Sequence, residues 1–214
     1  MIKAVKADQI IASILDTPLE NRNVELKPSI PWKDANRQHQ LQDIIKSVLG
    51  MSNVRDGGKI ILGVFQKQDK TFEVQGMKNE DLQTYDQDHI YQVVRIYGNP
   101  SPRFEVSNIE YNGKYFIVFT IQDFLYSPVI CLKNGNNNGT EPLVKGSLYT
   151  RTHKPETKRV NEETEMREII NLAIDKEIDV WSPRVQKLVP TQATKPLSMN
   201  NAKKFADELR DINL

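Results

Sequence analysis

Residues 56–65 read DGGKIILGVF, an apolar run that follows a pair of glycines. A run this short, without alternating polar residues, is typical of a strand that is covered on both faces. The residues before it carry apolar side chains three and four positions apart, at Leu41, Ile44, Ile45, Val48 and Leu49. That spacing predicts an amphipathic helix over residues 38–50. The centre of the chain therefore predicts a helix, a glycine turn and a central buried strand over residues 59–65.

Elements of both kinds continue on either side of this unit. Apolar residues at helical spacing predict three further helices, over residues 7–15, 79–97 and 161–176. Strand patterns occur at residues 23–27, 104–111, 114–122, 128–133 and 146–152. Asn112-Gly113 separates two of these strands and is typical of a two-residue β-hairpin turn. Together the patterns predict an α+β fold, with a mixed, mainly antiparallel sheet flanked by helices and a C-terminal helical extension.

The pattern changes after Lys176. Pro183, Pro190 and Pro196 interrupt regular structure until a last apolar stripe, formed by Ala202, Phe205, Ala206, Leu209 and Ile212. This stripe predicts a helix over about residues 199–212. We therefore expect a domain over residues 1–176, followed by a Pro-containing linker and C-terminal helix over residues 177–214.

Composition excludes some classes of function. The 214 residues have a formal net charge of +1, so any nucleic-acid surface must be local. The longest apolar stretch, residues 115–121, is far too short to span a bilayer, and residues 1–16 lack the apolar core of a signal peptide. The single cysteine, Cys131, excludes an internal disulfide and fits a reducing compartment. We expect a cytoplasmic protein with no membrane partner.

The first stretch that could carry chemistry is ENRNVELK, residues 20–27. Two carboxylates and an ammonium group, those of Glu20, Glu25 and Lys27, can hold a divalent cation and neutralise a phosphate. On a strand, Glu25 and Lys27 point to the same face because the side-chain period is two. The alternative is an exposed strand with a salt bridge.

The second stretch is SNVRDGG, residues 52–58, which joins the predicted helix to the buried strand. Tandem glycines permit positive φ, and such a turn can present backbone N–H groups to a phosphate. Asn53, Gly57 and Gly58 are therefore candidate nucleic-acid contacts. The alternative is a tight helix-to-strand turn without a ligand.

The third stretch is KGSLYTRTHKPETKR, residues 145–159. It holds five Lys or Arg residues against one acid, so its local charge is +4. A basic strand and loop of this kind can contact a phosphate backbone. The candidate contacts are Lys145, Tyr149, Arg151, Lys154, Lys158 and Arg159. A solvated charged loop is the alternative.

Taken in order, these stretches resemble the Schlafen AlbA-like domain family. The pattern begins with E-x4-E-L-K at residues 20–27 and continues with S-N-x-x-x-G-G at residues 52–58. Gly63-Val64, the step Val74-Gln75-Gly76-Met77 and the strand Tyr149-Thr150-Arg151 follow. The resemblance covers roughly residues 15–175.

The resemblance implies a nucleic-acid-binding protein that is also a metal-dependent nuclease acting on RNA or DNA. Glu20 and Glu25 match the family's two metal-binding glutamates, and Lys27 matches the lysine that follows them. The family's third acid comes directly after the G-V strand, where this chain has Phe65 and Gln66. Asp69 is then the best available third acid. The implied metal site is Glu20, Glu25 and Asp69 with Mg²⁺ or Mn²⁺, and Lys27 completes the catalytic set.

Two alternatives remain open at the level of sequence. One is a non-catalytic DNA- or RNA-binding subunit of a regulatory or defence complex. The other is a nuclease of the restriction-enzyme type, in which Glu25-Leu26-Lys27 is the E-x-K end and Asp16 is the upstream acid.

The resemblance also implies a partner. Schlafen cores resemble two AlbA-like lobes joined head to tail around a basic groove, and this chain has one E-x4-E-L-K. We therefore expect a homodimer or a partner subunit to complete the groove. The apolar stripe at residues 202–212 offers a means of association.

Overall fold

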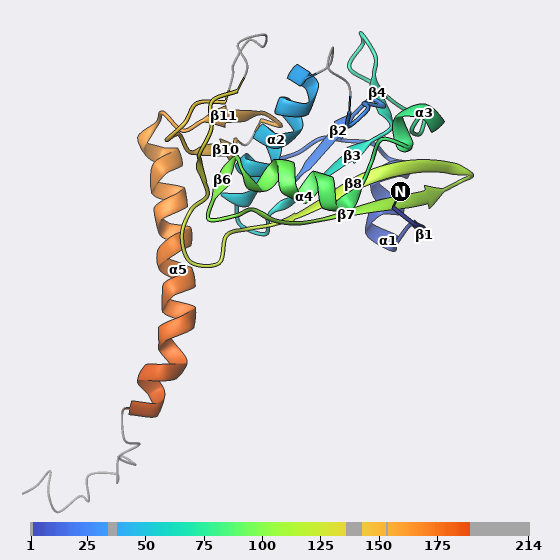
Figure 1. The fold of residues 1–214 in the computed structure, drawn as a ribbon. Coiled ribbons are helices and arrows are strands. Elements are labelled where there is room, and N and C mark those ends of the chain that lie inside the picture. Colours follow the sequence, from blue (N-terminus) through green and yellow to red (C-terminus); the bar gives the residue numbers. More distant parts are fainter. Residues whose placement is uncertain (1, 34–37, 136–142, 153, 189–214) are drawn as a thin grey trace, which may run out of the picture. The chain divides into compact units, whose positions relative to one another are not determined.

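A five-stranded mixed sheet forms the centre of the fold (Figure 1). The structure, a computed structural model, describes residues 2–33, 38–135, 143–152 and 154–188. The strands lie in the order β1 (Ala4–Lys6), β7 (Arg103–Tyr111), β8 (Lys114–Gln122), β3 (Gly58–Leu62) and β2 (Val24–Lys27). The two outer pairs are parallel, and β8 pairs antiparallel with β7 and with β3.

Three small antiparallel pairs surround this sheet. They are β4 (Val64–Gln66) with β5 (Phe72–Val74), β6 (Gly98–Asn99) with β9 (Ile130–Cys131), and β10 (Tyr149–Arg151) with β11 (Thr157–Arg159). With the central sheet, these pairs confirm the predicted α+β class and its mainly antiparallel pairing. The predicted hairpin is also confirmed, since Asn112 and Gly113 have φ values of 49° and 72° between β7 and β8.

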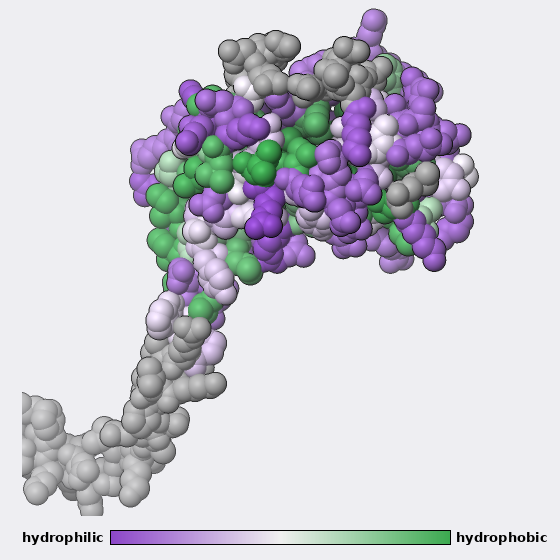
Figure 2. All heavy atoms as spheres, in the orientation of Figure 1, coloured by the Kyte–Doolittle hydropathy of each residue, from purple (hydrophilic) through white to green (hydrophobic). Residues whose placement is uncertain are grey.

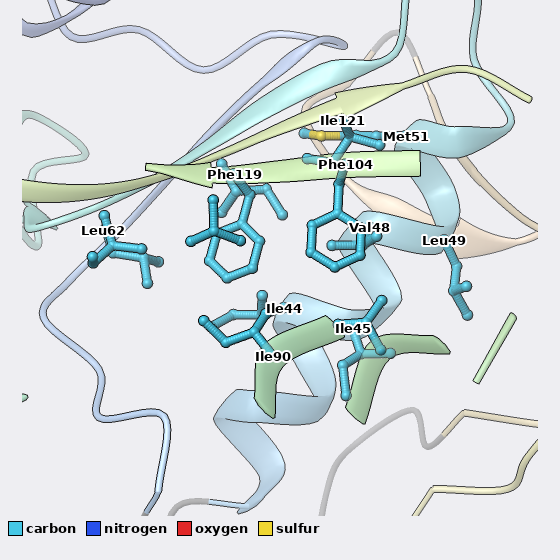
Figure 3. Packing of buried hydrophobic residues seen from close by; sticks show 14 of the residues in the cluster. Ile44, Ile45, Val48, Leu49, Met51, Leu62, Ile90, Phe104, Phe119 and Ile121 are labelled. Atoms are coloured by element: carbon cyan, nitrogen blue, oxygen red, sulfur yellow. The ribbon is translucent and has the colours of Figure 1, made fainter. Parts of the chain in front are cut away.

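Helices cover both faces of the central sheet. On one face, α2 (Gln38–Ser52) and α4 (Gln87–Arg95) pack against β3, β7 and β8. Figure 3 shows this contact, with Ile44 and Val48 of α2 facing Phe104 and Phe119 of the sheet. On the other face, α1 (Gln9–Asp16) packs its buried Ile11 and Leu15 against alternate residues of β3 and β8. The apolar sequence of β8 is explained by this cover on both faces.

The buried run at residues 59–65 is not one strand, and it is not in the middle of the sheet. β3 ends at Leu62, β8 lies in the middle, and β4 begins after Gly63. Gly63 has a φ of +109°, and a Cβ there would lie 2.8 Å from the carbonyl carbon of Gly76. This close approach turns the chain out of the central sheet, so the predicted strand is divided in two.

The predicted helix over residues 79–97 is also divided, into α3 (Asn79–Leu82) and α4. Asp86 lies between them and caps α4, because its side chain accepts a hydrogen bond from the backbone N–H of His89. The helix predicted to end at residue 176 is longer, since α5 runs over Glu163–Leu188. The helix continues past Lys176 because no glycine cap follows that residue. Pro183 lies within the helix and does not end it.

The chain divides into two compact units, Met1–Lys176 and Glu177–Leu214. The predicted helix over residues 199–212 lies outside the described residues, so the expected homodimer or partner subunit stays a prediction. Within the described part of the chain, no helix is long and apolar enough to cross a membrane. The surface visible in Figure 2 is mostly hydrophilic (purple), and hydrophobic residues (green) form smaller areas within it.

Candidate functional site

Glu25 is the centre of the polar cluster in this structure. It lies on β2, is 8% exposed, and points towards α2, whose Ser47 hydroxyl donates a hydrogen bond to its carboxylate. Its Oε1 is 2.7 Å from Nζ of Lys27, and its Oε2 is 2.6 Å from Nη1 of Arg151. Two cations therefore neutralise one buried carboxylate.

Arg151 is buried as deeply as the apolar core, at 1% exposed. Its guanidinium donates from all three nitrogens, and its five hydrogen bonds match the five N–H groups that an arginine carries. The acceptors are the backbone oxygens of Asn21, Arg22 and Val24, the carboxylate of Glu25, and the hydroxyl of Thr157, at 2.6 to 3.3 Å. Arg151 thus fastens β10 to the segment that leads into β2. It has no donor left for a phosphate, although the sequence indicated that role.

The electrostatics of Glu25 follow from these contacts. Burial by itself would raise the pKa of Glu25, but Lys27 and Arg151 outweigh burial and hold the pKa below its ordinary value. Glu20 differs, because burial raises its pKa and a single backbone hydrogen bond, from the N–H of Leu26 at 2.9 Å, only partly offsets this. The nearby charge of Glu25 raises the pKa of Glu20 further.

These carboxylates do not fit a divalent metal ion. Both oxygens of Glu25 already pair with cations, and a metal placed there would be repelled by Lys27 and Arg151. Asp69 accepts hydrogen bonds from the N–H and hydroxyl of Thr71 within its own turn, at 2.9 and 2.6 Å. Among the residues that the structure describes, no group of three or more His, Cys, Asp or Glu side chains could hold a metal. The structure therefore does not bring Asp69 together with Glu20 and Glu25.

Asp16, the upstream acid of the restriction-type alternative, is on the other side of the sheet from the Glu25 carboxylate. It ends α1 and accepts a hydrogen bond from the hydroxyl of Tyr111. Tyr111 packs with the cluster under α1, whereas Glu25 points towards α2. The pairing that this alternative requires is not present.

Asn53 is a structural residue in this fold. It is 2% exposed, and its amide bridges two segments of the chain. It donates to the backbone oxygens of Val129 and Tyr149 at 2.9 Å, and its oxygen accepts from the N–H of Val129 at 2.7 Å. The end of α2 is thereby fastened to the start of β10, and the amide is not directed at a ligand.

The glycine turn is also packed against protein. Gly57 has a φ of +63°, and a Cβ there would lie 2.0 Å from the backbone oxygen of Ile121. At Gly58 a Cβ would lie 2.8 Å from the backbone oxygen of Asn23. Asn23 in turn donates from its side-chain amide to the backbone oxygen of Gly57 at 2.5 Å. These glycines are needed for close packing of the turn on β8 and on the segment before β2.

The remaining predicted contacts belong to the β10–β11 hairpin and the loop before it. Tyr149 is buried, and its hydroxyl accepts a hydrogen bond from the N–H of Val144. Lys145, Lys154 and Arg159 are exposed. Lys158 is half-buried and pairs with Glu162 and Glu165 at 2.8 and 2.7 Å, and these contacts raise its pKa. Lys154 and Lys158 line a groove of about 600 Å³, and Arg151 is also among its lining residues.

Two arginines that sequence reasoning did not select also belong to this region. Arg22 lines the same groove and exchanges backbone contacts with Arg151, since each arginine donates from Nε to the other's carbonyl oxygen, at 3.1 and 3.0 Å. Arg55 lines a second hollow, of about 290 Å³, which also includes Arg22. Arg22 lies in residues 20–27 and Arg55 in residues 52–58, but the motifs in these two stretches pointed to acids and glycines as the functional residues.

Comparison with known proteins identifies the family of this chain. The sequence profile of the family described as Schlafen, AlbA_2 matches residues 20–161. The chain belongs to the Schlafen AlbA_2 family. The match includes the Glu25–Arg151 pair, Asn53 and the glycine turn, so the resemblance inferred from sequence is confirmed.

Two solved structures are similar to this chain at low sequence identity. One is the crystal structure of the DIP2311 protein from Corynebacterium diphtheriae, at 14% identity and a TM-score of 0.45, over 73% of this chain. This chain spans only 26% of that protein chain. The other is the solution structure of the N-terminal domain of a protein described as related to the ATP-dependent DNA helicase RecG, from Nitrosomonas europaea. It has 17% identity and a TM-score of 0.39, over 71% of this chain and 94% of that one. No curated protein sequence gives a significant match.

The first prediction concerns Glu25. Glu25→Gln leaves Arg151 buried without its counter-charge, so we expect a loss of about 3 kcal/mol or more in unfolding free energy at pH 7. The folded-state pKa of Glu25 is lowered, so its contribution exists above the unfolded value of 4.5 and disappears as pH falls through the folded value. The difference in unfolding free energy between the variant and the wild type, measured by urea unfolding, should therefore become smaller below pH 4.5.

Glu20→Gln is the matched control, because burial raises the pKa of Glu20 and its ionised form is not stabilised in the same way. We expect a smaller loss for this variant. Equal stability of Glu25→Gln and wild type at pH 7 would contradict the structural role of the pair.

The second prediction concerns the glycine turn. In Gly57→Ala the new methyl group would clash with the backbone of Ile121 and the residue would keep a positive φ. We therefore expect the unfolding free energy to fall by about 3 kcal/mol or more. Gly113 also has a positive φ, of 72°, but nothing lies within 4 Å of a Cβ there. Gly113→Ala should therefore lower the unfolding free energy by only about 1 to 2 kcal/mol, from backbone strain alone. Thermal unfolding of the two variants measures the difference, and equal losses would rule out close packing at Gly57.

Proposed function

We propose that the first unit of this chain binds nucleic acid, RNA or DNA, through the basic side of the β10–β11 hairpin and the loop before it. The observation that carries the proposal is the exposure of Lys145, Lys154 and Arg159 on a segment of local charge +4, in a chain whose net charge is only +1. Charges gathered in this way attract a polyanion by releasing its condensed counterions. Membership of the Schlafen AlbA_2 family supports the same function.

The hairpin is also held in a fixed position, which favours binding. Its strands pair in register, with Arg151 opposite Thr157 and Tyr149 opposite Arg159. Arg151 fastens the buried side of the hairpin to β2, so the exposed cations are carried on a rigid base. Preorganised cations lose less conformational entropy when a phosphate binds.

We propose binding without the metal-dependent cleavage that the family resemblance also implied. The support is the state of Glu25, whose carboxylate is shared by Lys27 and Arg151 instead of being open to a cation. The position after Gly63-Val64 is Phe65, which brings no oxygen ligand. Glu25 and Lys27 therefore act as structural partners, and the function closest to the geometry is that of a non-catalytic DNA- or RNA-binding subunit.

The third prediction tests the binding surface. Lys154→Glu with Arg159→Glu should weaken binding to RNA and DNA of different sequences about equally. The dependence of log affinity on log salt should become shallower, by about one unit per lost phosphate contact. Fluorescence anisotropy with labelled oligonucleotides at several salt concentrations measures both quantities.

The matched control reverses two exposed lysines at β1, with Lys3→Glu just before the strand and Lys6→Glu at its end. β1 is the edge strand opposite β2, to which the hairpin is fastened. The change in net charge is the same, but we expect affinity to change much less. Equal weakening by both double variants would show that the hairpin is not the contact surface.

The fourth prediction concerns metal. Labelled tRNA, single-stranded DNA and duplex DNA should stay intact with the protein and Mn²⁺, and EDTA should leave binding affinity unchanged. Gel electrophoresis and anisotropy measure these two outcomes. Mn²⁺-dependent cleavage that is lost in Glu20→Gln, while the variant stays folded at the assay temperature, would instead establish the metal-dependent nuclease.

A further inference from the structure

The first part of α5 places acids directly on cations of the domain. Glu162, just before the helix, and Glu165 pair with Lys158, at 2.8 and 2.7 Å. Glu168 pairs with Arg22, and Asp175 pairs with Arg55. The acids contact three cations that come from three separate parts of the fold: the segment before β2, the glycine turn and β11.

These three cations lie along one continuous depression. The groove of about 600 Å³ includes Lys158 and Arg22, and the hollow of about 290 Å³ includes Arg22 and Arg55. Both are lined by the pair formed by Arg22 and Glu168, so they meet there. We name the three residues Arg22, Arg55 and Lys158 the cation row.

The cation row adjoins the proposed nucleic-acid surface. Lys154 lines the same groove as Lys158 and Arg22. A phosphate backbone that contacts the exposed hairpin would therefore reach the row next. There it meets the carboxylates of α5, which repel it and already hold the donors that it needs.

Packing and ion pairs hold α5 in different ways. Ile169 and Leu172 are 1% and 4% exposed and join the main core, so the first part of the helix is firmly packed on the domain. The acidic side chains are not buried to the same degree, since Glu162, Glu168 and Asp175 are 59%, 48% and 51% exposed. Ion pairs at this exposure contribute little free energy, so the carboxylates can turn into solvent while the helix stays in place.

One of the pairs is also incompletely satisfied. Glu165 is the most buried of the four acids, and its Oε2 has no hydrogen-bond partner among the described residues. A buried carboxylate oxygen without a donor destabilises the contact. Glu165 is therefore an imperfect partner for Lys158, as expected of a group that gives way to another anion.

We infer that the cation row is a phosphate-binding track for nucleic acid and that the acids of α5 compete with the phosphates for it. This inference rests on the proposed function and adds its regulation. The helix stays docked, the ion pairs exchange one by one, and each carboxylate that remains on the row lowers the affinity for nucleic acid. Arg22 and Arg55 are thereby assigned as binding residues.

The fifth prediction compares variants of the full chain that each remove one negative charge from α5. Asp175→Asn frees Arg55 and Glu168→Gln frees Arg22, so each should tighten binding to a labelled oligonucleotide by about 3-fold. The matched control is Glu163→Gln, whose carboxylate is 80% exposed and pairs with Arg167 on the same helix. It should change affinity much less, although the change in net charge is identical.

A double-mutant cycle separates direct competition from a general effect of charge. Arg55→Gln should weaken binding about 3-fold, and Asp175→Asn should no longer tighten binding when Arg55 is absent. Arg55 is suited to this test because its side chain is 60% exposed, so its loss leaves the core intact. Thermal unfolding of each variant checks that the fold is kept.

The outcomes distinguish the inference from the proposed function. In one outcome the wild type binds, but Asp175→Asn and Glu168→Gln tighten binding no more than Glu163→Gln does. This result overturns the inference and leaves the proposed function standing. Tightening by Asp175→Asn that persists in the Arg55→Gln background also overturns it. Absence of binding by wild type and all variants, to RNA and DNA alike at low salt, overturns the proposed function and the inference with it.

Discussion

The pairing of Glu25 with Arg151 is the contact on which the rest of this structure depends. A carboxylate and a guanidinium can be buried together only if their remaining donors and acceptors are satisfied. Here Lys27 and Ser47 satisfy the remaining acceptor capacity of Glu25. Backbone oxygens and the hydroxyl of Thr157 accept the remaining hydrogen bonds of Arg151. The pair joins residues that are 126 positions apart, and it fastens the β10–β11 hairpin to the edge of the central sheet.

A consequence is that the motifs which mark the family are mostly architectural. The E-L-K strand supplies the buried carboxylate, the Y-x-R strand supplies its cation, and Asn53 fastens α2 to both neighbouring segments. The glycine turn packs so closely on Ile121 that a side chain has no room. Groups that are saturated by protein contacts cannot also recognise a ligand. We therefore assign recognition, in the proposed function, to the side chains around them, on the exposed side of the hairpin and in the cation row.

The charge balance of the chain also has a structural explanation. The net charge of +1 is the sum of a basic hairpin and of the acids in and just before α5, which follow the hairpin directly in sequence and contact cations in space. Because the acids sit on the cations, the groove between them holds both signs of charge. In the proposed function, attraction for a polyanion is then set by how readily those ion pairs exchange. The number of basic residues does not set it alone.

The sequence by itself determined the α+β class, the Asn112-Gly113 hairpin, the helix α2 and the family, because each depends on local periodicity or on residues in a fixed order. It also placed Glu25, Arg151 and Asn53 among the important residues. Only the tertiary structure decided what they do, since burial and hydrogen-bond partners come from segments far apart in the chain. The strand break at Gly63 has the same origin, because it depends on the distant Gly76. Likewise, Arg22 and Arg55 became candidate binding residues only when folding brought α5 across them, because a charge acquires its role from the neighbours that surround it in space.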